Sequence, residues 1–177
     1  MHMPIEPLPI TDYLTGVNNR REFFRLSGLE FEKVLRHKGH LSVISFEIDN
    51  FHHIISQHGY ETADAILSTF AKMCAASCRK YDILGRIDEE EFALLLPRER
   101  VATAVPIAEK ILGKARELTV PVKEGELGFT VSVGVVEAEL DSDKSFESFM
   151  KRAESQVFLA NQRGGNQVAF AEHSNPA

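Results

Sequence analysis

Asp82-Ile-Leu-Gly-Arg-Ile-Asp-Glu-Glu-Glu-Phe-Ala-Leu-Leu-Leu-Pro97 is the stretch that decides the fold. It contains two apolar runs, 82–87 and 90–96, and two such runs with a two-residue connection predict a β-hairpin. The connecting residues, Asp88 and Glu89, are unusual. The tight turns that suit hairpins need positive φ, so they favour Gly, Asn or Asp, and Glu89 is a poor choice for that backbone.

Four carboxylates follow one another from Asp88 to Glu91 and repel each other. Alternation along the second strand directs Glu90 and Glu91 to opposite faces, so we expect one of them to face a cleft or a partner. A simpler explanation for Asp88 and Glu89 is a solvated acidic rim at the tip of the hairpin.

The composition is that of one globular domain. The 177 residues are 44% hydrophobic, enough for one core and too few for two large ones. The net charge of −6 argues against a polyanion-binding surface, so no nucleic-acid polymer is expected as a partner. Cys74 and Cys78 lie in a helical pattern, which fits a reducing cytoplasm. No apolar run reaches the roughly 18 residues of a membrane span, so we expect a cytoplasmic chain or the cytoplasmic part of a larger protein.

The chain divides into three segments. Residues 1–11 carry three prolines and are expected to be a linker or N-terminal tail. Residues 12–171 form the domain, and 172–177 form a C-terminal tail.

Helical periodicity describes much of the domain. Asn18 or Asn19 is expected to cap a first helix, and Gly39 is expected to end it. The apolar residues that this helix carries are Phe23, Phe24, Phe31, Val34 and Leu35. Further helices are expected at 50–58, 61–78, 103–118 and 145–163.

Gly59 is expected to stop one of these helices, and Pro106 fits only near the first turn of another. Besides the hairpin, strands are expected at 41–49, 129–136 and 167–170. Because hairpins imply antiparallel pairs and strict strand–helix alternation is absent, the predicted fold class is α+β, with one mainly antiparallel sheet covered by helices.

The run from Arg86 to Phe92, followed by Leu-Leu-Pro97, resembles the signature hairpin of the GGDEF family, the bacterial diguanylate cyclase domain. In that signature two glycines precede Asp/Glu-Glu-Phe, and their positions here are Asp88 and Glu89. Supporting segments follow in the family's order at 12–21, 46–51, 59–67, 130–134 and 164–166. The resemblance covers about 12–170 and implies a nucleotidyl cyclase-like fold.

Diguanylate cyclases join two GTP molecules, and metal ions and fixed cations must stabilise the phosphates. The resemblance implies that Glu47, the Ile48 carbonyl and Glu90 would hold metal, and that Glu90 and Glu91 are the remnants of the catalytic signature. Glu47 stands where the family has Asp, and Mg²⁺ tolerates altered geometry badly. We therefore expect weak or vestigial metal binding, with no cofactor required and Mg²⁺ only if the cleft binds nucleotide.

Other departures from the family pattern argue against catalysis. Asp88 and Glu89 add bulk and charge where phosphates would lie. The family's phosphate-clamping Lys and Arg correspond to Asn161 and Gly165, and losing one preorganised charge typically costs about 10²–10³ in rate. Arg163 is a candidate to replace one lost cation.

The nucleotide cleft has also changed at the guanine end. The family's guanine-contacting Asn corresponds to Ile55 and a nearby lysine-like position to His52, which leaves Asp64 as a guanine acceptor. His52, His53 and His58 lie in a polar stretch without Asp or Cys at metal-ligand spacing, so the sequence predicts surface residues there and no zinc site.

One family motif is intact. Arg79-Lys-Tyr-Asp82 resembles the inhibitory RxxD site that binds the product, cyclic di-GMP. An Arg fork suits guanine or phosphate, and an Asp accepts from guanine nitrogens. The resemblance implies a further basic residue from the next helix, here Lys110.

These observations favour a degenerate, catalytically inactive GGDEF domain that binds cyclic di-GMP or another nucleotide. The alternatives are an active diguanylate cyclase and a protein-interaction domain without a ligand. Expected partners are cyclic di-GMP, GTP with weak affinity and neighbouring signalling domains of a larger protein, and a homodimer is compatible with the resemblance.

Overall fold

The computed structural model describes residues 3–172, so part of each expected tail, 1–2 and 173–177, lies outside the described residues. The helices and strands, in chain order, are α1 (Arg20–His37), β1 (Leu41–Ile48), α2 (Phe51–Ser77), β2 (Ile83–Asp88), β3 (Glu91–Pro97), α3 (Val101–Glu117), β4 (Thr119–Val122), β5 (Gly125–Gly128), β6 (Val131–Glu137), α4 (Phe146–Gln162) and β7 (Gln167–Phe170).

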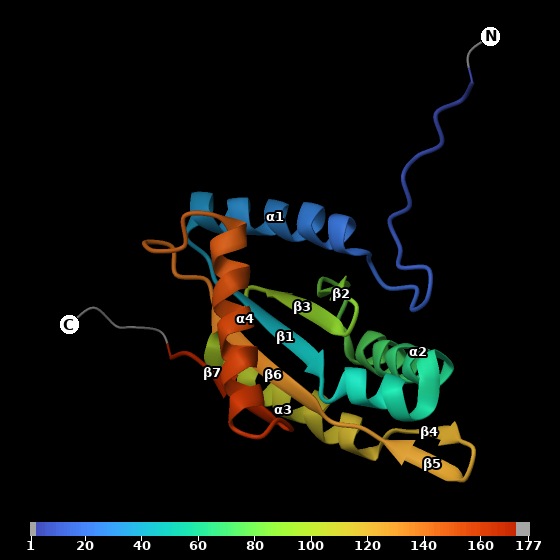
Figure 1. Ribbon diagram of the computed structural model, residues 1–177. Helices are drawn as coiled ribbons and strands as arrows, with labels where there is room; N and C mark the ends of the chain where they lie inside the picture. Colours follow the sequence, from blue (N-terminus) through green and yellow to red (C-terminus); the bar gives the residue numbers. More distant parts are fainter. Residues whose placement is uncertain (1–2, 173–177) are drawn as a thin grey trace.

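A five-stranded sheet in the order β2-β3-β1-β6-β7 forms the centre of the fold (Figure 1). Strand β1 pairs antiparallel with both β3 and β6, and β2 pairs antiparallel with β3. Only β6 and β7 run parallel in this sheet. The predicted α+β class with a mainly antiparallel sheet is confirmed.

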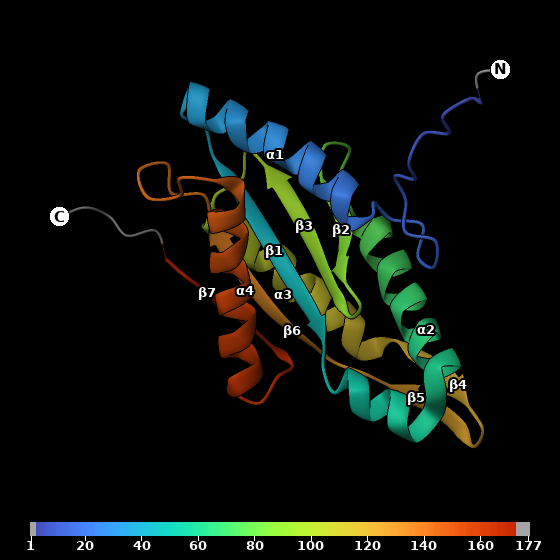
Figure 2. The ribbon, with the colours of Figure 1, turned by 45° about the horizontal axis from the view of Figure 1, so that its top comes forward.

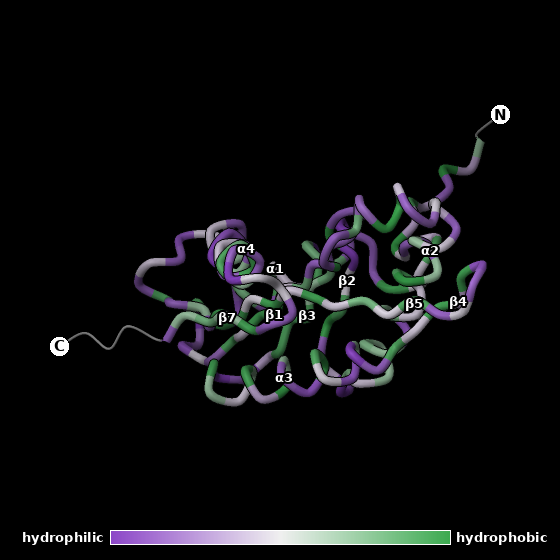
Figure 3. Tube along the Cα trace, turned by 60° about the horizontal axis from the view of Figure 1, so that its bottom comes forward, coloured by the Kyte–Doolittle hydropathy of each residue, from purple (hydrophilic) through white to green (hydrophobic). Residues whose placement is uncertain are grey.

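Helices cover both faces of the sheet. Figure 2 shows α1 and α4 in front of the strands, and Figure 3 shows α3 and α4 on opposite sides of them. The α1–α4 side is filled by phenylalanines, including Phe23, Phe31 and Phe149, and the α2–α3 side contains Phe46 and Phe70 among its buried residues. Successive side chains of a β-strand point to opposite faces of the sheet, so alternate residues of each strand pack into one core or the other.

The first helix begins as expected and ends differently. Asn19 caps it by accepting a hydrogen bond from the Glu22 N–H at 2.9 Å. At the other end Lys38, with φ 53°, takes the left-handed conformation, one residue before the glycine that was expected to end the helix. Of the apolar residues expected on this helix, Phe23, Phe31 and Val34 are buried, whereas Leu35 is 40% exposed. The last buried residue of this helix is Val34, which lies on the same face as Phe31.

The predicted hairpin is present, but its turn lies one residue further on. Residues 89 and 90 form the turn, and Asp88 pairs with Glu91. A bulge between Arg86 and Asp88 supplies the extra residue. Neither turn residue has positive φ, so Glu89 fits this backbone and the expected conflict is absent.

Two other features differ from the sequence expectations. Strands β4 and β5 form a small hairpin of their own that was not predicted. Helix α3 begins at Val101, so Pro106 lies in its second turn rather than near its first. The expected break at Gly59 is confirmed by its non-helical φ of 86° within α2.

Candidate functional site

The hairpin tip lies beside the end of β1. Glu47 of β1 pairs with Glu91 of β3, and the Ile48 N–H donates to the Glu90 carbonyl at 3.1 Å. The structure therefore brings Glu47 to the same end of the sheet as Glu90 and Glu91, although Glu47 precedes Glu90 by 43 positions in the chain. Carboxylate and carbonyl oxygens are the donors that Mg²⁺ prefers, so this donor set fits the ion that the family's chemistry requires.

Arg86 fixes the backbone of the tip. Its Nε and Nη2 donate to the Glu89 carbonyl at 3.1 and 2.7 Å, and its Nη1 donates to both carboxylate oxygens of Asp12 at 3.2 Å. Burial opposes ionisation of Asp12, but hydrogen bonds from Thr15 and the charge of Arg86 outweigh it and lower the pKa of that carboxyl. The turn before α1 thus supports the hairpin.

The acidic residues at this end of the sheet destabilise one another's charged forms. Burial, with the nearby charges of Glu47, Asp88, Glu154 and Glu90, raises the pKa of Glu91 to about 7. Burial and the charge of Glu90 likewise raise the pKa of Glu47. A cation placed among them would relieve this repulsion.

Asp49 is a buried carboxylate with a structural role. It accepts hydrogen bonds from the hydroxyls of Thr130 and Ser132 and, at 2.9 Å, from the Asn166 N–H. A Cβ added at Gly165 would lie 2.9 Å from Asp49 Oδ2, and Gly165 has φ +73°. This glycine, at the family's arginine position, is therefore required by the local backbone.

The residues at the other candidate cation positions, Asn161 and Arg163, form no ion pair with the hairpin carboxylates within residues 3–172. Asn161 is exposed on α4. Arg163 caps α4 through its backbone, and its side chain forms no ion pair within the described residues. Sequence reasoning missed Arg116, at the end of α3, whose guanidinium donates to Asn166 Oδ1 at 2.8 Å and to the Asn166 carbonyl at 3.2 Å. It lines a cavity of about 420 Å³ together with Asp49.

The residues expected at the guanine end of the nucleotide cleft are Ile55, Asp64 and His52. Ile55 packs against the α2–α3 core, and Asp64 is exposed on α2. His52 is exposed, as expected, and lies at the hairpin tip, with its Nε2 3.9 Å from Glu90 Oε1. Nothing in the sequence spacing of residues 52 and 90 indicates this approach.

Arg79 and Asp82 converge at the end of α2. The Asp82 Oδ2 accepts from the Arg79 N–H at 2.9 Å and from Arg79 Nε at 3.4 Å. Arg79 Nη1 also donates to Glu99 Oε1 at 3.0 Å. The Arg79 side chain is 51% exposed, whereas that of Asp82 is 5% exposed. A ligand would meet the arginine first.

Lys110 does not contact this pair within the described residues. Its neighbour one helical turn later, Lys114, comes closer, since its Nζ donates to the Ser77 hydroxyl at 3.4 Å, two residues before Arg79. Lys110 and Lys114 are four residues apart and share one side of α3, the side on which Lys114 reaches Ser77 of α2.

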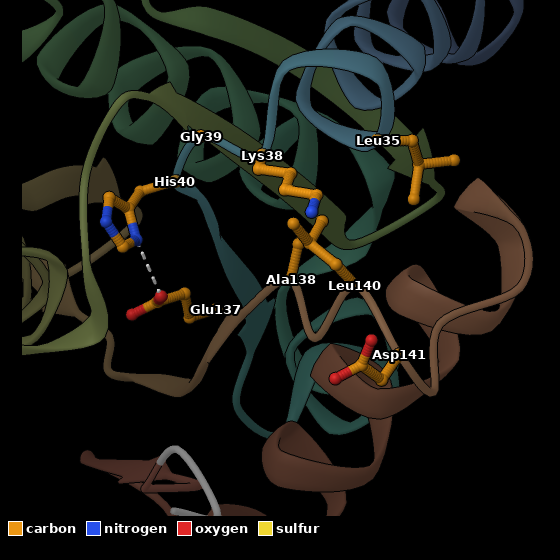
Figure 4. Close-up of a pocket in the computed structure, with 8 residues that line it drawn as sticks. All are labelled: Leu35, Lys38, Gly39, His40, Glu137, Ala138, Leu140 and Asp141. Carbon is orange, nitrogen blue, oxygen red and sulfur yellow. Dashed lines mark hydrogen bonds and ion pairs between the residues drawn. The ribbon is translucent and has the colours of Figure 1, made fainter.

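A cavity of about 480 Å³ lies at the opposite end of the sheet (Figure 4). There His40 Nδ1 lies 3.1 Å from Glu137 Oε2, and Glu137 Oε1 accepts from the Val101 N–H at 2.9 Å. Because both oxygens of Glu137 have partners, this carboxylate holds the start of α3 against the sheet.

The family pattern described as "Diguanylate cyclase, GGDEF domain" matches residues 10–167. The chain belongs to the GGDEF family. The chain is 31% identical over 160 residues to the diguanylate cyclase DgcM of Escherichia coli K12, which covers 90% of this chain and 38% of DgcM. The chain spans less than half the length of the curated relatives it matches.

Solved structures agree with this assignment. The GGDEF domain of DgcB from Caulobacter crescentus, in complex with cyclic di-GMP, superposes with a TM-score of 0.88 at 24% identity and 98% coverage of both chains. The diguanylate cyclase SiaD from Pseudomonas aeruginosa, in complex with its activator SiaC, gives a TM-score of 0.85 at 32% identity, covering 92% of this chain and 62% of SiaD. Within residues 3–172 no helix is both long and apolar enough to cross a membrane.

Proposed function

We propose that this GGDEF domain lacks diguanylate cyclase activity and binds cyclic di-GMP through Arg79 and Asp82, as a cytoplasmic regulatory module of a larger signalling protein. The observation that carries the proposal is the convergence of these two side chains at the end of α2. The arginine is half exposed and the aspartate is held in place by the Arg79 N–H.

The chemistry of this pair suits a guanine dinucleotide. The guanidinium fork can donate two parallel hydrogen bonds to guanine O6 and N7 or to a phosphate. The carboxylate can accept from guanine N1 and N2. Glu99 occupies one nitrogen of Arg79 in the free domain, so binding exchanges this partly exposed ion pair for contacts with the ligand.

The hairpin tip gives less support to catalysis. Glu89 stands at a family glycine position, and the nearby carboxylates already raise each other's pKa values, as they do for Glu91. The clamp positions are Asn161 and Gly165, and Arg116 is committed to Asn166. A triphosphate would thus add negative charge to an acidic site that lacks the expected cations.

Calorimetric titrations with cyclic di-GMP and with GTP plus Mg²⁺ test the proposal. We expect cyclic di-GMP to bind, and Arg79→Ala to weaken binding by about ten- to a hundredfold, because a charge-assisted bidentate contact contributes roughly 1.5–3 kcal/mol. Asp82→Asn should also weaken binding, since it replaces an acceptor pair with one acceptor and one donor. Lys80→Ala is the matched control, because the Lys80 ammonium lies over the neighbouring Tyr81 ring and forms no ion pair within residues 3–172.

No binding at high micromolar ligand, or binding indifferent to both substitutions, would refute the assignment. In the second case the ligand would belong to the cleft near Glu47, Asp64 and Glu90.

The alternative of an active cyclase is favoured by one observation: Glu47, Glu90 and Glu91 remain together at the end of β1. Incubation with GTP and Mg²⁺ followed by chromatography distinguishes the two. Cyclic di-GMP formation that Glu90→Ala abolishes would establish the cyclase. We expect none, and none after Asp88 and Glu89 are replaced by glycine, because the clamp cations would still be missing.

The third candidate, a protein-interaction domain, is supported by the SiaD–SiaC complex, in which a 32% identical relative binds its activator. It predicts no heat with either nucleotide.

A further inference from the structure

Three side chains at the hairpin tip form a cluster that the family pattern does not contain. His52, on the first turn of α2, faces the tip, with its Nε2 3.9 Å from Glu90 Oε1. One ligand atom from each of His52, Glu89 and Glu90 lies within 4.8 Å of the others. We propose that these three side chains bind a divalent transition-metal ion of the Zn²⁺ class.

The donor set favours this class of ion. Imidazole suits Zn²⁺, Ni²⁺ and Cu²⁺, whereas Mg²⁺ and Ca²⁺ prefer oxygen ligands alone. Zinc bonds of about 2.0–2.1 Å in a tetrahedral site place ligand atoms roughly 3.4 Å apart. The 3.9 Å between His52 and Glu90 is therefore close to the required separation, and water would complete the coordination.

The backbones that carry the ligands are already fixed. Two hydrogen bonds from Arg86 hold the Glu89 carbonyl, and the Ile48 N–H holds that of Glu90. Next to His52, Phe51 is 4% exposed and anchors the start of α2. The His52 side chain is 77% exposed and that of Glu90 is 19% exposed, so side-chain rotation alone brings the ligand atoms together.

The site differs from the expected magnesium site, which would use Glu47, the Ile48 carbonyl and Glu90. The two sites share only Glu90. A transition metal held by His52 draws Glu90 towards α2, so it competes with Mg²⁺ for that carboxylate. His52 and Glu89 both stand where the family pattern has other residue types, so the site belongs to this chain. It does not depend on cyclic di-GMP binding.

Titration of the chelator-treated chain with Zn²⁺, followed by calorimetry, tests the proposal. Co²⁺ provides a second probe, because its visible absorption reports bound imidazole and carboxylate. We expect one ion per chain. His52→Ala should weaken binding by at least about tenfold, because even outer-shell partners of a metal contribute 10–100-fold, and Glu89→Gln should weaken it too.

His53→Ala is the matched control, since His53 is exposed on the same helix and lines the cavity near Arg116 instead. Cys78→Ser controls for thiol binding, because Cys78 is a free, partly buried cysteine. The proposal is supported if only the His52 and Glu89 variants lose affinity, while all variants keep the parent's metal-free melting temperature. Unchanged affinity in His52→Ala, equal loss in His53→Ala, dependence on Cys78, or no binding at high micromolar Zn²⁺ would overturn it.

Discussion

Replacement of Asp49 by Ala should destabilise the domain more than removal of any exposed acid. The carboxylate is buried and accepts from the Thr130 hydroxyl at 2.7 Å, the Ser132 hydroxyl and the Asn166 N–H at 2.9 Å. Losing a hydrogen bond to a charged group costs about 1.5–3 kcal/mol when the other partner stays buried. Thr130 is partly exposed and can turn to water, so two full losses predict a decrease of about 3–6 kcal/mol in the free energy of unfolding.

Urea unfolding at neutral pH, followed by circular dichroism, measures this decrease. Asp49→Asn keeps one acceptor oxygen and should lose about half as much. Asp64→Ala, at an exposed position on α2, should stay within about 0.5 kcal/mol of the parent. A loss below about 1 kcal/mol for Asp49→Ala would show that the three donors find other partners, and would refute the structural role assigned to this carboxylate.

Three further predictions concern pH, glycine and ligand affinity. The pKa of Glu91 rises from 4.5 to about 7 on folding, so within that window the folded chain binds a proton that the unfolded chain releases. The free energy of unfolding should therefore fall as the pH rises from 4.5 to about 7. In Glu91→Gln, urea unfolding at several pH values should no longer show this contribution to the decrease. Gly165→Ala, at φ +73°, should lower the melting temperature, whereas Gly28→Ala, in open space on α1, should raise stability by about 0.5–1 kcal/mol. Glu99→Gln should tighten cyclic di-GMP binding about two- to fivefold, because it frees Arg79 from an exposed ion pair of about 0.5–1 kcal/mol; weaker binding in calorimetry would contradict this.

Local patterns in the sequence predicted most of the fold. The alternating run at 41–49 and the apolar runs around the acidic tip became β1, β2 and β3. Gly59 interrupts α2, as its conformational freedom suggests. These features depend on neighbouring residues and on side-chain period, which a sequence displays directly.

Features set by distant contacts could not be predicted in the same way. The turn moved by one residue because a bulge follows Arg86, whose side chain is fixed by Asp12, 74 positions away. The approach of His52 to Glu90 depends on how α2 packs beside the hairpin. Arg116 looked like an ordinary basic residue in the last turn of α3, and only the tertiary fold places it against Asn166.

The hydrogen bonds of Arg86 also have a mechanical consequence. One guanidinium joins the Asp12 carboxylate to the Glu89 carbonyl. Force applied to the segment before α1 therefore has a direct route to the tip of the hairpin through this side chain, in addition to the hydrogen bonds that join Asn18 to the Leu84 carbonyl and the Arg86 N–H of β2. Arg86→Ala would release the Glu89 carbonyl at the tip, whereas Asn18 would still hold the segment against β2.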